Sequence, residues 1–524
     1  MATGVKYRIE RDFLGEKQLP AEALYGIHSV RATENFPDKH HFSFEWYRAM
    51  GLVKLACLKT IQAYGRALDK RTSGPADKRT GGQADREKIE ALIMAAEEIS
   101  RGEHFYSFIV PAIQGGAGTS INMNINEILS NVALLRLKRD PGDYTLVDPL
   151  EDANRYQSTN DVVPTALKVA TIFLLQDLEK RINALREEVE KLEQAYRNTL
   201  RIGYTQMQEA VPTSFGKLFG SYCEALSRDW WRVSKCFERL KEVNLGGGAV
   251  GTAIALPQFY TMQVVRELQQ LTGLPVTRGE HLPDTTANMD PLVEVHAILK
   301  AHAVNLEKIV SDIRLLSSDI ANPGSRKSVT IPAKQTGSTI MPGKVNPVIS
   351  EFVIGAAHQV YANDQLIAGL AGQGCLELNA YLPVMGNALL ESINLLISCD
   401  QTLREHLFTG LAADHSRSLN LVMHSPSLTT ALIPYIGYNK ASEIAAIMRS
   451  KGIDIIAAWG EWTGGQADRR TSGQADRRTG GQSDRRTGGQ ADKRTGGLDE
   501  KKLREILKPE NLLKLGYTLK DLEG

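Results

Sequence analysis

Apolar residues recur at the spacing of an α-helix over much of the chain. From about Asp161 to Leu200 they fall three or four residues apart, a period that predicts a long amphipathic helix. Strand-like alternation is rare, and residues 1–40 are expected to be mixed and loop-like. The sequence therefore predicts a mainly α protein whose middle is a bundle of long helices. The other helical stretches are 45–68, 86–99, 214–242, 258–272, 288–320, 347–370 and 383–408, with a further apolar helix ending near 137.

A polar eight-residue unit interrupts this pattern twice. It occurs in residues 69–86 and again in 463–497, and its copies are rich in Asp, Gly, Thr and Arg. The unit has no apolar residue larger than Ala, so its copies cannot bury a stacked core. We expect both inserts to be disordered surface connections. An RNA- or polyanion-binding tail is the alternative, but Asp interrupts the positive charge and the unit has no aromatic residue for stacking.

Composition narrows the class of protein. Hydrophobic residues make up 42% of the chain, enough for large cores, and the net charge of +1 gives no support to a polyanion-binding role. The five cysteines form no CxxC pair, which argues against a zinc site and a disulfide framework. The first residues lack the apolar core of a signal peptide, and no uninterrupted apolar run approaches the roughly 18 residues of a membrane span. We therefore expect a cytoplasmic protein with neither a nucleic-acid nor a membrane partner.

A short polar stretch between two helical patterns carries the strongest chemical signal. Its sequence is GSTIMPGKVNP, residues 337–347. Two glycines and a proline break regular structure, which predicts a mobile loop. Asn346 and Pro347 then predict a helix start, with an N-cap amide and a proline at the first helical position. Such a helix N-terminus favours negative charge, although a solvated turn would also explain the stretch taken alone.

Three other segments share the chemical character of this loop. They are Gly118-Thr119-Ser120, Ser158-Thr159-Asn160 and Thr205-Gln206. Helix capping explains any one of them taken alone. Together with the loop they offer hydroxyls, amides and one lysine, but no cluster of His, Cys or acidic metal ligands. Such a set suits a small polycarboxylate that is held by hydrogen bonds and one cation.

These segments together resemble the aspartase/fumarase superfamily. Residues 337–347 look like its signature, and residues 116–127 and 157–161 resemble its two other characteristic regions in the same order. Residues 25–36 and the sequence Gly-Ala-Gly-Thr-Ser in the first region are similar to the aspartase branch. Fumarases have a histidine at the position where this chain has Gln206. The acidic partner of that histidine is kept in this chain as Glu351. The chain is thus identified as a member of the aspartase branch.

The resemblance implies a fold and an assembly. The expected fold has three mainly helical domains, 1–156, 157–410 and 411–524, with one polar insert in the first domain and one in the last. The long central helices of four identical chains would pack into one shared bundle. Each active site of this homotetramer would then be built from segments of three subunits.

The resemblance also implies an activity, the reversible anti-elimination of ammonia from L-aspartate to give fumarate. Ser338 would be the general base. No organic cofactor is implied; magnesium activates some relatives, but no dedicated ligand set is visible. The implied binding roles are Thr119, Ser158, Thr159 and Thr339 for the β-carboxylate, Asn160 and Gln206 for the amino group, and Thr205, Lys344 and Asn346 for the α-carboxylate.

Two other interpretations stay open at this point. One is a fumarate hydratase, or a lyase that acts on another amine adduct of fumarate; Gln206 and the N-terminal segment weigh against the hydratase. The other is a non-catalytic helical scaffold. A scaffold would be expected to lose the loop chemistry, but Ser338, Lys344 and Asn346 are all present.

Overall fold

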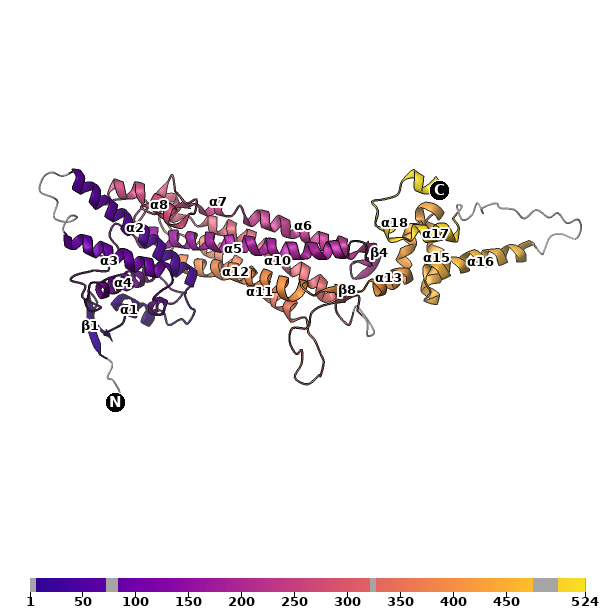
Figure 1. The fold of residues 1–524 in the computed structure, drawn as a ribbon, viewed down its shortest axis with the longest axis horizontal. Coiled ribbons are helices and arrows are strands. Elements are labelled where there is room, and N and C mark those ends of the chain that lie inside the picture. Colours follow the sequence, from indigo (N-terminus) through magenta and orange to yellow (C-terminus); the bar gives the residue numbers. More distant parts are fainter. Residues whose placement is uncertain (1–5, 72–82, 321–326, 475–497, 524) are drawn as a thin grey trace, which may run out of the picture. The chain divides into compact units, whose positions relative to one another are not determined.

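The chain forms two compact units in the computed structural model (Figure 1). The structure describes residues 6–71, 83–320, 327–474 and 498–523. Unit 1 comprises Met1–Ile182, Arg228–Leu306 and Val353–Asp400; unit 2 comprises Asn183–Ser227, Glu307–Phe352 and Gln401–Gly524. The division into domains 1–156, 157–410 and 411–524 stays a prediction.

Unit 1 is mainly helical, as predicted. Its long helices agree with the predicted stretches to within a few residues, because each buries an apolar stripe. These helices are α2 (Phe44–Arg71), α3 (Gln83–Ser100), α4 (Thr119–Arg136), α5 (Thr159–Ala195), α8 (Gln258–Thr272), α10 (Asp290–Leu316), α11 (Val348–Ala371) and α12 (Leu382–Thr402). Shorter elements are η1 (Phe105–Ser107), α7 (Phe237–Leu240), α9 (Leu282–Ala287) and the parallel strands β5 (Glu242–Val243) and β6 (Thr277–Arg278). The unit boundaries fall inside five helices, namely α5, α10, α11, α12 and α6 (Phe215–Val233).

Residues 6–40 are more ordered than the sequence predicts. Strands β1 (Tyr7–Asp12) and β2 (Gly15–Pro20) form an antiparallel hairpin, and helix α1 (Ile27–Asn35) follows. The expectation of a loop-like segment is therefore wrong. Alternation is weak in these strands because most of their side chains are exposed or half-buried, with Glu10 and Leu19 as the buried positions.

Unit 2 combines a hairpin with a small helical core. Strands β3 (Leu200–Thr205) and β4 (Gln208–Ser214) pair antiparallel, and Leu200 and Ile202 join a cluster that includes Val422, Ile444 and Trp459. The remaining elements are α6 (Phe215–Val233), β7 (Val329–Thr330), the π-helical turn η2 (Leu403–Phe408), β8 (Ala412–Ala413), α13 (His415–His424), η3 (Pro426–Leu432), α14 (Ile433–Ile436), α15 (Tyr438–Lys451), α16 (Ile455–Gln474), α17 (Glu500–Ile506), α18 (Pro509–Leu513) and α19 (Leu519–Glu523).

The polar inserts are shorter than predicted. Helix α2 continues to Arg71, α3 begins at Gln83, and α16 continues to Gln474, so the expectation of disorder over 69–86 and 463–497 is wrong at these edges. A helix that is already nucleated extends into a polar sequence at little further cost. Residues 72–82 and 475–497 lie outside the described residues, and disorder there stays a prediction.

One helical segment is apolar enough to cross a membrane by composition. Among the described residues this segment is Leu382–Phe408, with a mean hydropathy of 1.4 in its most apolar window, of which 61% is buried inside the protein. Core helices of soluble proteins share this composition, and burial to this extent is what a core helix requires.

Candidate active site

The start of helix α5 in unit 1 holds three of the predicted substrate-binding residues. The Ser158 backbone N–H donates to Oδ1 of Asp161 at 3.0 Å, and the Ser158 hydroxyl accepts from the Asn160 N–H at 3.2 Å. This is the reciprocal pattern of a capped helix N-terminus. The same segment therefore caps helix α5 and carries three predicted substrate-binding residues. Ser158, Thr159 and Asn160 are each half-buried.

Helix α4 begins beside this segment. Gly118 directly precedes Thr119, and a Cβ added to Gly118 would lie 3.0 Å from Cγ1 of Val163 on α5. One turn into α4, Asn122 Nδ2 donates to the Thr159 hydroxyl at 3.2 Å. The structure therefore brings Thr119 into the same region as Ser158, Thr159 and Asn160; their role in a shared carboxylate site stays a prediction.

A buried lysine, which the sequence interpretation missed, lies behind these residues. Lys54 of α2 is 0% exposed, and its Nζ donates to Gln157 Oε1 at 2.8 Å and to Asn154 Oδ1 at 3.2 Å. Asn154 Oδ1 also accepts from Asn122 Nδ2 at 3.0 Å. Burial lowers the pKa of Lys54 to about 7, although Cys57 and Asp161 oppose the shift. The available sequence signal was a lone lysine in an apolar helical stretch.

Asn160 is held by groups that come from a distant segment of unit 1. Its side-chain Nδ2 donates to the Ala249 carbonyl at 2.8 Å, and its backbone carbonyl accepts from Asn244 Nδ2, also at 2.8 Å. A backbone carbonyl only accepts hydrogen bonds, so the amide nitrogen must face it. Oδ1 of Asn160 is therefore the atom that is free to accept a proton donor from a ligand.

In unit 2, Thr205 and Gln206 lie at the tip of the β3–β4 hairpin. Thr205 pairs with Gln208, which leaves Gln206 and Met207 as a two-residue turn with φ of 52° and 62°. Left-handed pairs of this kind favour Asn and Gly, and larger residues there carry backbone strain. Both predicted residues are exposed. The hairpin was missed because its turn lacks the usual Asn-Gly signal.

The 337–347 loop in unit 2 is organised around its own backbone. The Ser338 hydroxyl accepts from the backbone N–H groups of Ile340 at 3.1 Å and Met341 at 2.9 Å. The Gly337 N–H donates to the Lys344 carbonyl at 2.9 Å. Ser338 is half-buried, whereas Thr339 and Lys344 are exposed. The prediction of a loop is confirmed; its mobility stays a prediction.

The predicted helix start after this loop needs a correction. Helix α11 begins at Val348, one residue later than the prediction of Pro347 at the first helical position. Among the described residues no backbone N–H donates to Asn346 Oδ1, so the expected side-chain cap is not formed, whereas Asn346 Nδ2 donates to the Gly337 carbonyl at 2.6 Å. This amide thus closes the two ends of the loop onto each other.

Glu351, the residue that would pair with a histidine in fumarases, has a different partner here. Its Oε1 lies 3.8 Å from Arg314 Nη2, and both side chains are about half exposed.

The ten predicted site residues fall into three groups. The start of α4 and α5 holds Thr119, Ser158, Thr159 and Asn160; the hairpin tip holds Thr205 and Gln206; the loop holds Ser338, Thr339, Lys344 and Asn346.

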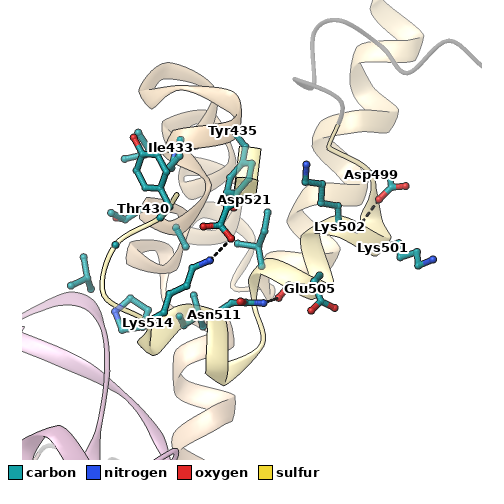
Figure 2. A pocket seen from close by; sticks show the side chains of 18 residues that line it. Thr430, Ile433, Tyr435, Asp499, Lys501, Lys502, Glu505, Asn511, Lys514 and Asp521 are labelled. Atoms are coloured by element: carbon teal, nitrogen blue, oxygen red, sulfur yellow. Dashed lines mark hydrogen bonds and ion pairs between the residues drawn. The ribbon is translucent and has the colours of Figure 1, made fainter. Parts of the chain in front are cut away.

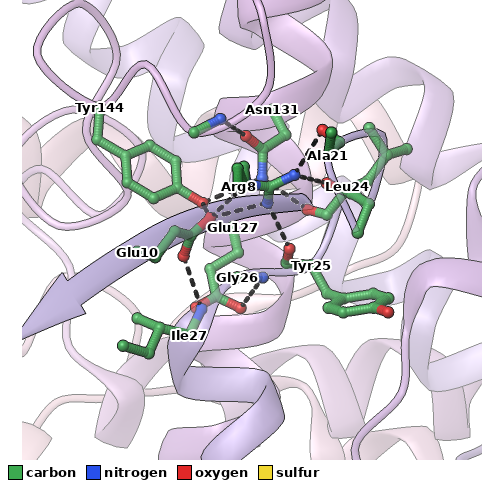
Figure 3. A network of polar contacts seen from close by, with 12 residues as sticks. Arg8, Glu10, Ala21, Leu24, Tyr25, Gly26, Ile27, Glu127, Asn131 and Tyr144 are labelled. Carbon is green, nitrogen blue, oxygen red and sulfur yellow. Dashed lines mark hydrogen bonds and ion pairs between the residues drawn. The ribbon is translucent and has the colours of Figure 1, made fainter. Parts of the chain in front are cut away.

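The N-terminal segment is fixed to α4 by a second buried network (Figure 3). Glu127 accepts from the N–H groups of Gly26 at 2.8 Å and His28 at 2.9 Å, and also from the Ser29 hydroxyl. Burial raises the pKa of Glu127 to about 7, while these donors act in the opposite direction. A carboxylate from α4 therefore caps helix α1, in the segment that resembles the aspartase branch.

A cavity of about 1050 Å³ in unit 2 contains none of the predicted site residues (Figure 2). The C-terminal segment forms much of its wall. Its polar groups are largely engaged with one another: Lys514 pairs with Asp521 at 2.7 Å, and Asn511 Nδ2 donates to the Glu505 carbonyl at 2.7 Å. Its size alone does not make it the catalytic site, because the donor set predicted for the chemistry lies elsewhere.

A divalent metal has poor support among the described residues. The one group there with ligand atoms within 4.8 Å of one another is Glu98, Glu103 and His104. Arg136 forms an ion pair with Glu98, and Arg101 Nε lies 2.8 Å from Glu103 Oε1. Arginines thus already neutralise both carboxylates, and the group does not fit a magnesium ion, which needs several free oxygen ligands.

Comparison with known proteins gives this geometry a family context. A family model described as "Lyase" matches residues 15–362. The aspartate ammonia-lyase of Bacillus subtilis (strain 168) is 38% identical over 457 residues, which cover 86% of this chain and 92% of that protein.

Two solved structures share the fold. A fumarate lyase:delta crystallin from Brucella melitensis bound to cobalt is 35% identical, with a TM-score of 0.79, covering 86% of this chain and 95% of that one. A class II fumarase from Schistosoma mansoni has a TM-score of 0.78 but is 25% identical, covering 87% of this chain and 96% of that one. The fold is thus common to lyases and hydratases, whereas the amino-acid identity is higher to the aspartate ammonia-lyase.

Proposed function

This chain belongs to the aspartase branch of the aspartase/fumarase superfamily of lyases, and we propose that it releases ammonia reversibly from L-aspartate to give fumarate. The observation that carries the proposal is the fixed set of neutral donors at the start of α4 and α5, with buried Lys54 behind it. Such a set fits a dicarboxylate, and the orientation of the Asn160 amide fits an amino group.

The chemical difficulty of the reaction is the removal of a weakly acidic proton next to a carboxylate. The electron pair left on carbon spreads into that carboxylate and gives an aci-carboxylate with two negative charges. Donors placed where this charge develops provide most of the stabilisation. In the proposal Thr119, Ser158 and Thr159 provide it, with Thr339 from the loop, and Lys54 adds a positive charge from behind.

Ser338 is the proposed general base. A serine hydroxyl is a poor base unless its alkoxide is stabilised. The N–H groups of Ile340 and Met341 point at Ser338 Oγ, so the loop already offers two donors to a negative charge on this oxygen. Closure of the loop over the substrate would exclude water and strengthen both interactions.

The remaining proposed contacts concern the other end of the substrate. Thr205, Lys344 and Asn346 bind the α-carboxylate, and Asn160 and Gln206 contact the amino group that leaves as ammonia. The substrate's own carboxylate accepts the electron pair, so the reaction needs no organic cofactor. We further place the enzyme in the cytoplasm as a homotetramer in which segments of three subunits complete each site.

Ultraviolet absorbance of fumarate tests the proposed function directly. The purified full chain should produce fumarate from L-aspartate, and should form it from L-malate far more slowly. Turnover of L-malate without turnover of L-aspartate would instead support a fumarate hydratase. Absence of turnover with either substrate would leave a lyase for another amine adduct of fumarate, or the non-catalytic scaffold.

A further inference from the structure

One carboxylate joins the start of α5 to a glycine-rich segment far away in the sequence. Asp161 is 0% exposed, and its two oxygens have separate tasks. Oδ1 accepts from the Ser158 N–H at 3.0 Å, whereas Oδ2 accepts from the N–H groups of Gly246 at 3.2 Å and Gly248 at 3.0 Å. Helix capping explains only the hydrogen bond from the Ser158 N–H to Oδ1. The two bonds to the glycines require another explanation.

The glycine segment 246–251 is held in a tight conformation. Gly248 has φ of +70°, and a Cβ added at Gly251 would lie 2.3 Å from the Pro283 backbone nitrogen. The backbone of 244–248 is buried, and the Ala253 N–H donates to the Gly247 carbonyl at 2.8 Å. The Ala249 carbonyl follows directly after the residues that Asp161 holds, so its position depends on them.

The Ala249 carbonyl in turn sets the orientation of the Asn160 amide. It accepts from Nδ2 at 2.8 Å, which leaves Oδ1 as the outward acceptor. The Asn160 backbone is fixed from the same side. Pro164 inside α5 has no N–H that could donate to the Asn160 carbonyl. Asn244 Nδ2 donates to this carbonyl instead, at 2.8 Å.

We propose that Asp161 is a positioning residue for amine recognition: it holds segment 246–249 so that the Ala249 carbonyl fixes the Asn160 amide with Oδ1 facing the substrate ammonium. The inference rests on the proposed function, because it assumes that the ligand carries an amino group. An ammonium donates hydrogen bonds and cannot accept them. A fixed Oδ1 acceptor on Asn160 therefore favours an ammonium. An amide that could turn over freely would present its NH₂ group to the substrate half of the time. Asp161 itself touches no substrate.

Replacement of Asp161 by Asn separates the two tasks of the carboxylate. The Asp161→Asn variant keeps one acceptor oxygen, and the Ser158 hydroxyl still accepts from the Asn160 N–H, so the carboxylate-binding segment keeps part of its cap in either orientation of the new amide. If the new NH₂ group faces Gly246 and Gly248, it cannot accept from their N–H groups. If the oxygen faces them instead, a neutral amide holds them less strongly than a carboxylate does. In both cases the glycine segment is loosened, and the Asn160 amide has a less well fixed partner.

Equilibrium binding in a Ser338→Ala background, where turnover is blocked, measures the effect. Calorimetry would give Kd for L-aspartate and for succinate, a dicarboxylate without an amino group. In Asp161→Asn we expect Kd for L-aspartate to rise about tenfold, and Kd for succinate to change less than about twofold. The matched control is Asp400→Asn, another fully buried aspartate, whose partner is His302; it should leave the ratio of the two Kd values unchanged.

A second variant acts on the segment without altering the carboxylate. In Gly248→Ala the new Cβ would meet Leu256 Cδ1 at 3.5 Å, an ordinary contact, so only the positive φ causes strain. It should also weaken L-aspartate binding more than succinate binding. Equal weakening of both ligands, or no change in either, in both variants would overturn the inference. If the wild-type enzyme converts L-aspartate while the ratio does not change, the inference alone fails; if L-aspartate is not converted, the proposed function fails.

Discussion

The segment at the start of α5 and the 337–347 loop are both parts of the proposed site, yet they are stabilised in opposite ways. Ser158, Thr159 and Asn160 are tied to α4, to α2 through Gln157 and Lys54, and to the glycine segment by buried groups. The side-chain hydrogen bonds described for the loop join its own residues, such as Ser338 to Met341 and Asn346 to Gly337. A segment fixed by its surroundings can hold charge in place, whereas a loop fixed by itself can move as one body.

The largest expected effect comes from the loop. Ser338→Ala should lower the rate of fumarate formation by a factor on the order of 10³ to 10⁴, because the general base is lost. The melting temperature should change by less than about 2 °C, since a half-buried loop hydroxyl contributes little to the core. Absorbance of fumarate and a thermal melt measure the two quantities. Ser398→Ala, at an exposed helical serine, is the control; full activity of Ser338→Ala would refute the base assignment.

A smaller but still large effect is expected behind the fixed segment. Lys54→Met should raise KM for L-aspartate by about 10- to 100-fold, because it removes a buried positive charge and leaves Gln157 Oε1 without its donor. Steady-state kinetics and a melt should show losses in both binding and stability. Lys168→Met is the matched control, as Lys168 is also buried but donates to the Glu242 carbonyl at 2.7 Å. If both variants had the same KM, Lys54 would have no special electrostatic role.

Two glycines of the loop allow a finer test of its movement as one body. A Cβ at Gly337 would lie 2.5 Å from the Lys344 carbonyl oxygen, whereas a Cβ at Gly343 would meet nothing within 4 Å, although its φ is +77°. Gly337→Ala should therefore lower kcat about tenfold by opening the base of the loop, and Gly343→Ala should lower it by a smaller factor through backbone strain alone. Equal kcat values for the two variants would contradict the proposed importance of the Gly337–Lys344 closure.

An effect on stability, with none expected on the chemistry of the site, concerns pH and the helices of unit 1. Burial favours neutral His302, but attraction by Asp400 and hydrogen bonds to Asp229 and Asp400 outweigh it and raise the pKa of His302 to about 10. An unfolded histidine has a pKa of about 6.5. The stabilisation is thus complete below pH 6.5 and is lost as pH rises towards 10, by about 1.4 kcal/mol of unfolding free energy per pH unit within that window.

Thermal melts between pH 6.5 and 9.5 would measure this dependence. His302→Gln should be less stable at pH 6.5 and should lose less stability on the alkaline side than the wild type. His296→Gln is the control, because burial lowers the pKa of His296, in the opposite direction to that of His302. An equally steep alkaline loss in His302→Gln and the wild type would mean that His302 does not carry the proton.

The long helices were predictable because each is amphipathic over many turns, and α8 begins and ends at the predicted residues. The hairpin β3–β4 was not predictable from the sequence, because Gln206 and Met207 form its turn in left-handed conformations that their side chains do not favour. The N-terminal hairpin was missed for a related reason, as few of its side chains are buried.

The candidate site shows the same limit. Hydroxyls and amides in short polar segments could be recognised from their chemistry and from the family resemblance. The groups that hold them could not, because Lys54, Asp161 and Glu127 act through partners that are distant in sequence. Asn346 was assigned to a cap from its local sequence, whereas in the structure its Nδ2 donates to the Gly337 carbonyl at the other end of the loop.

The capping of α1 by Glu127 has a consequence for the synthesis of the chain. Helix α1 has nine residues, too few for a stable helix by itself, and the Gly26 N–H reaches its acceptor 101 residues later. A ribosome must therefore release α4 before the N-terminal segment can acquire its native hydrogen bonds. The segment that forms α1 must therefore wait for about 100 further residues to be made, and until then it is open to chaperones and proteases.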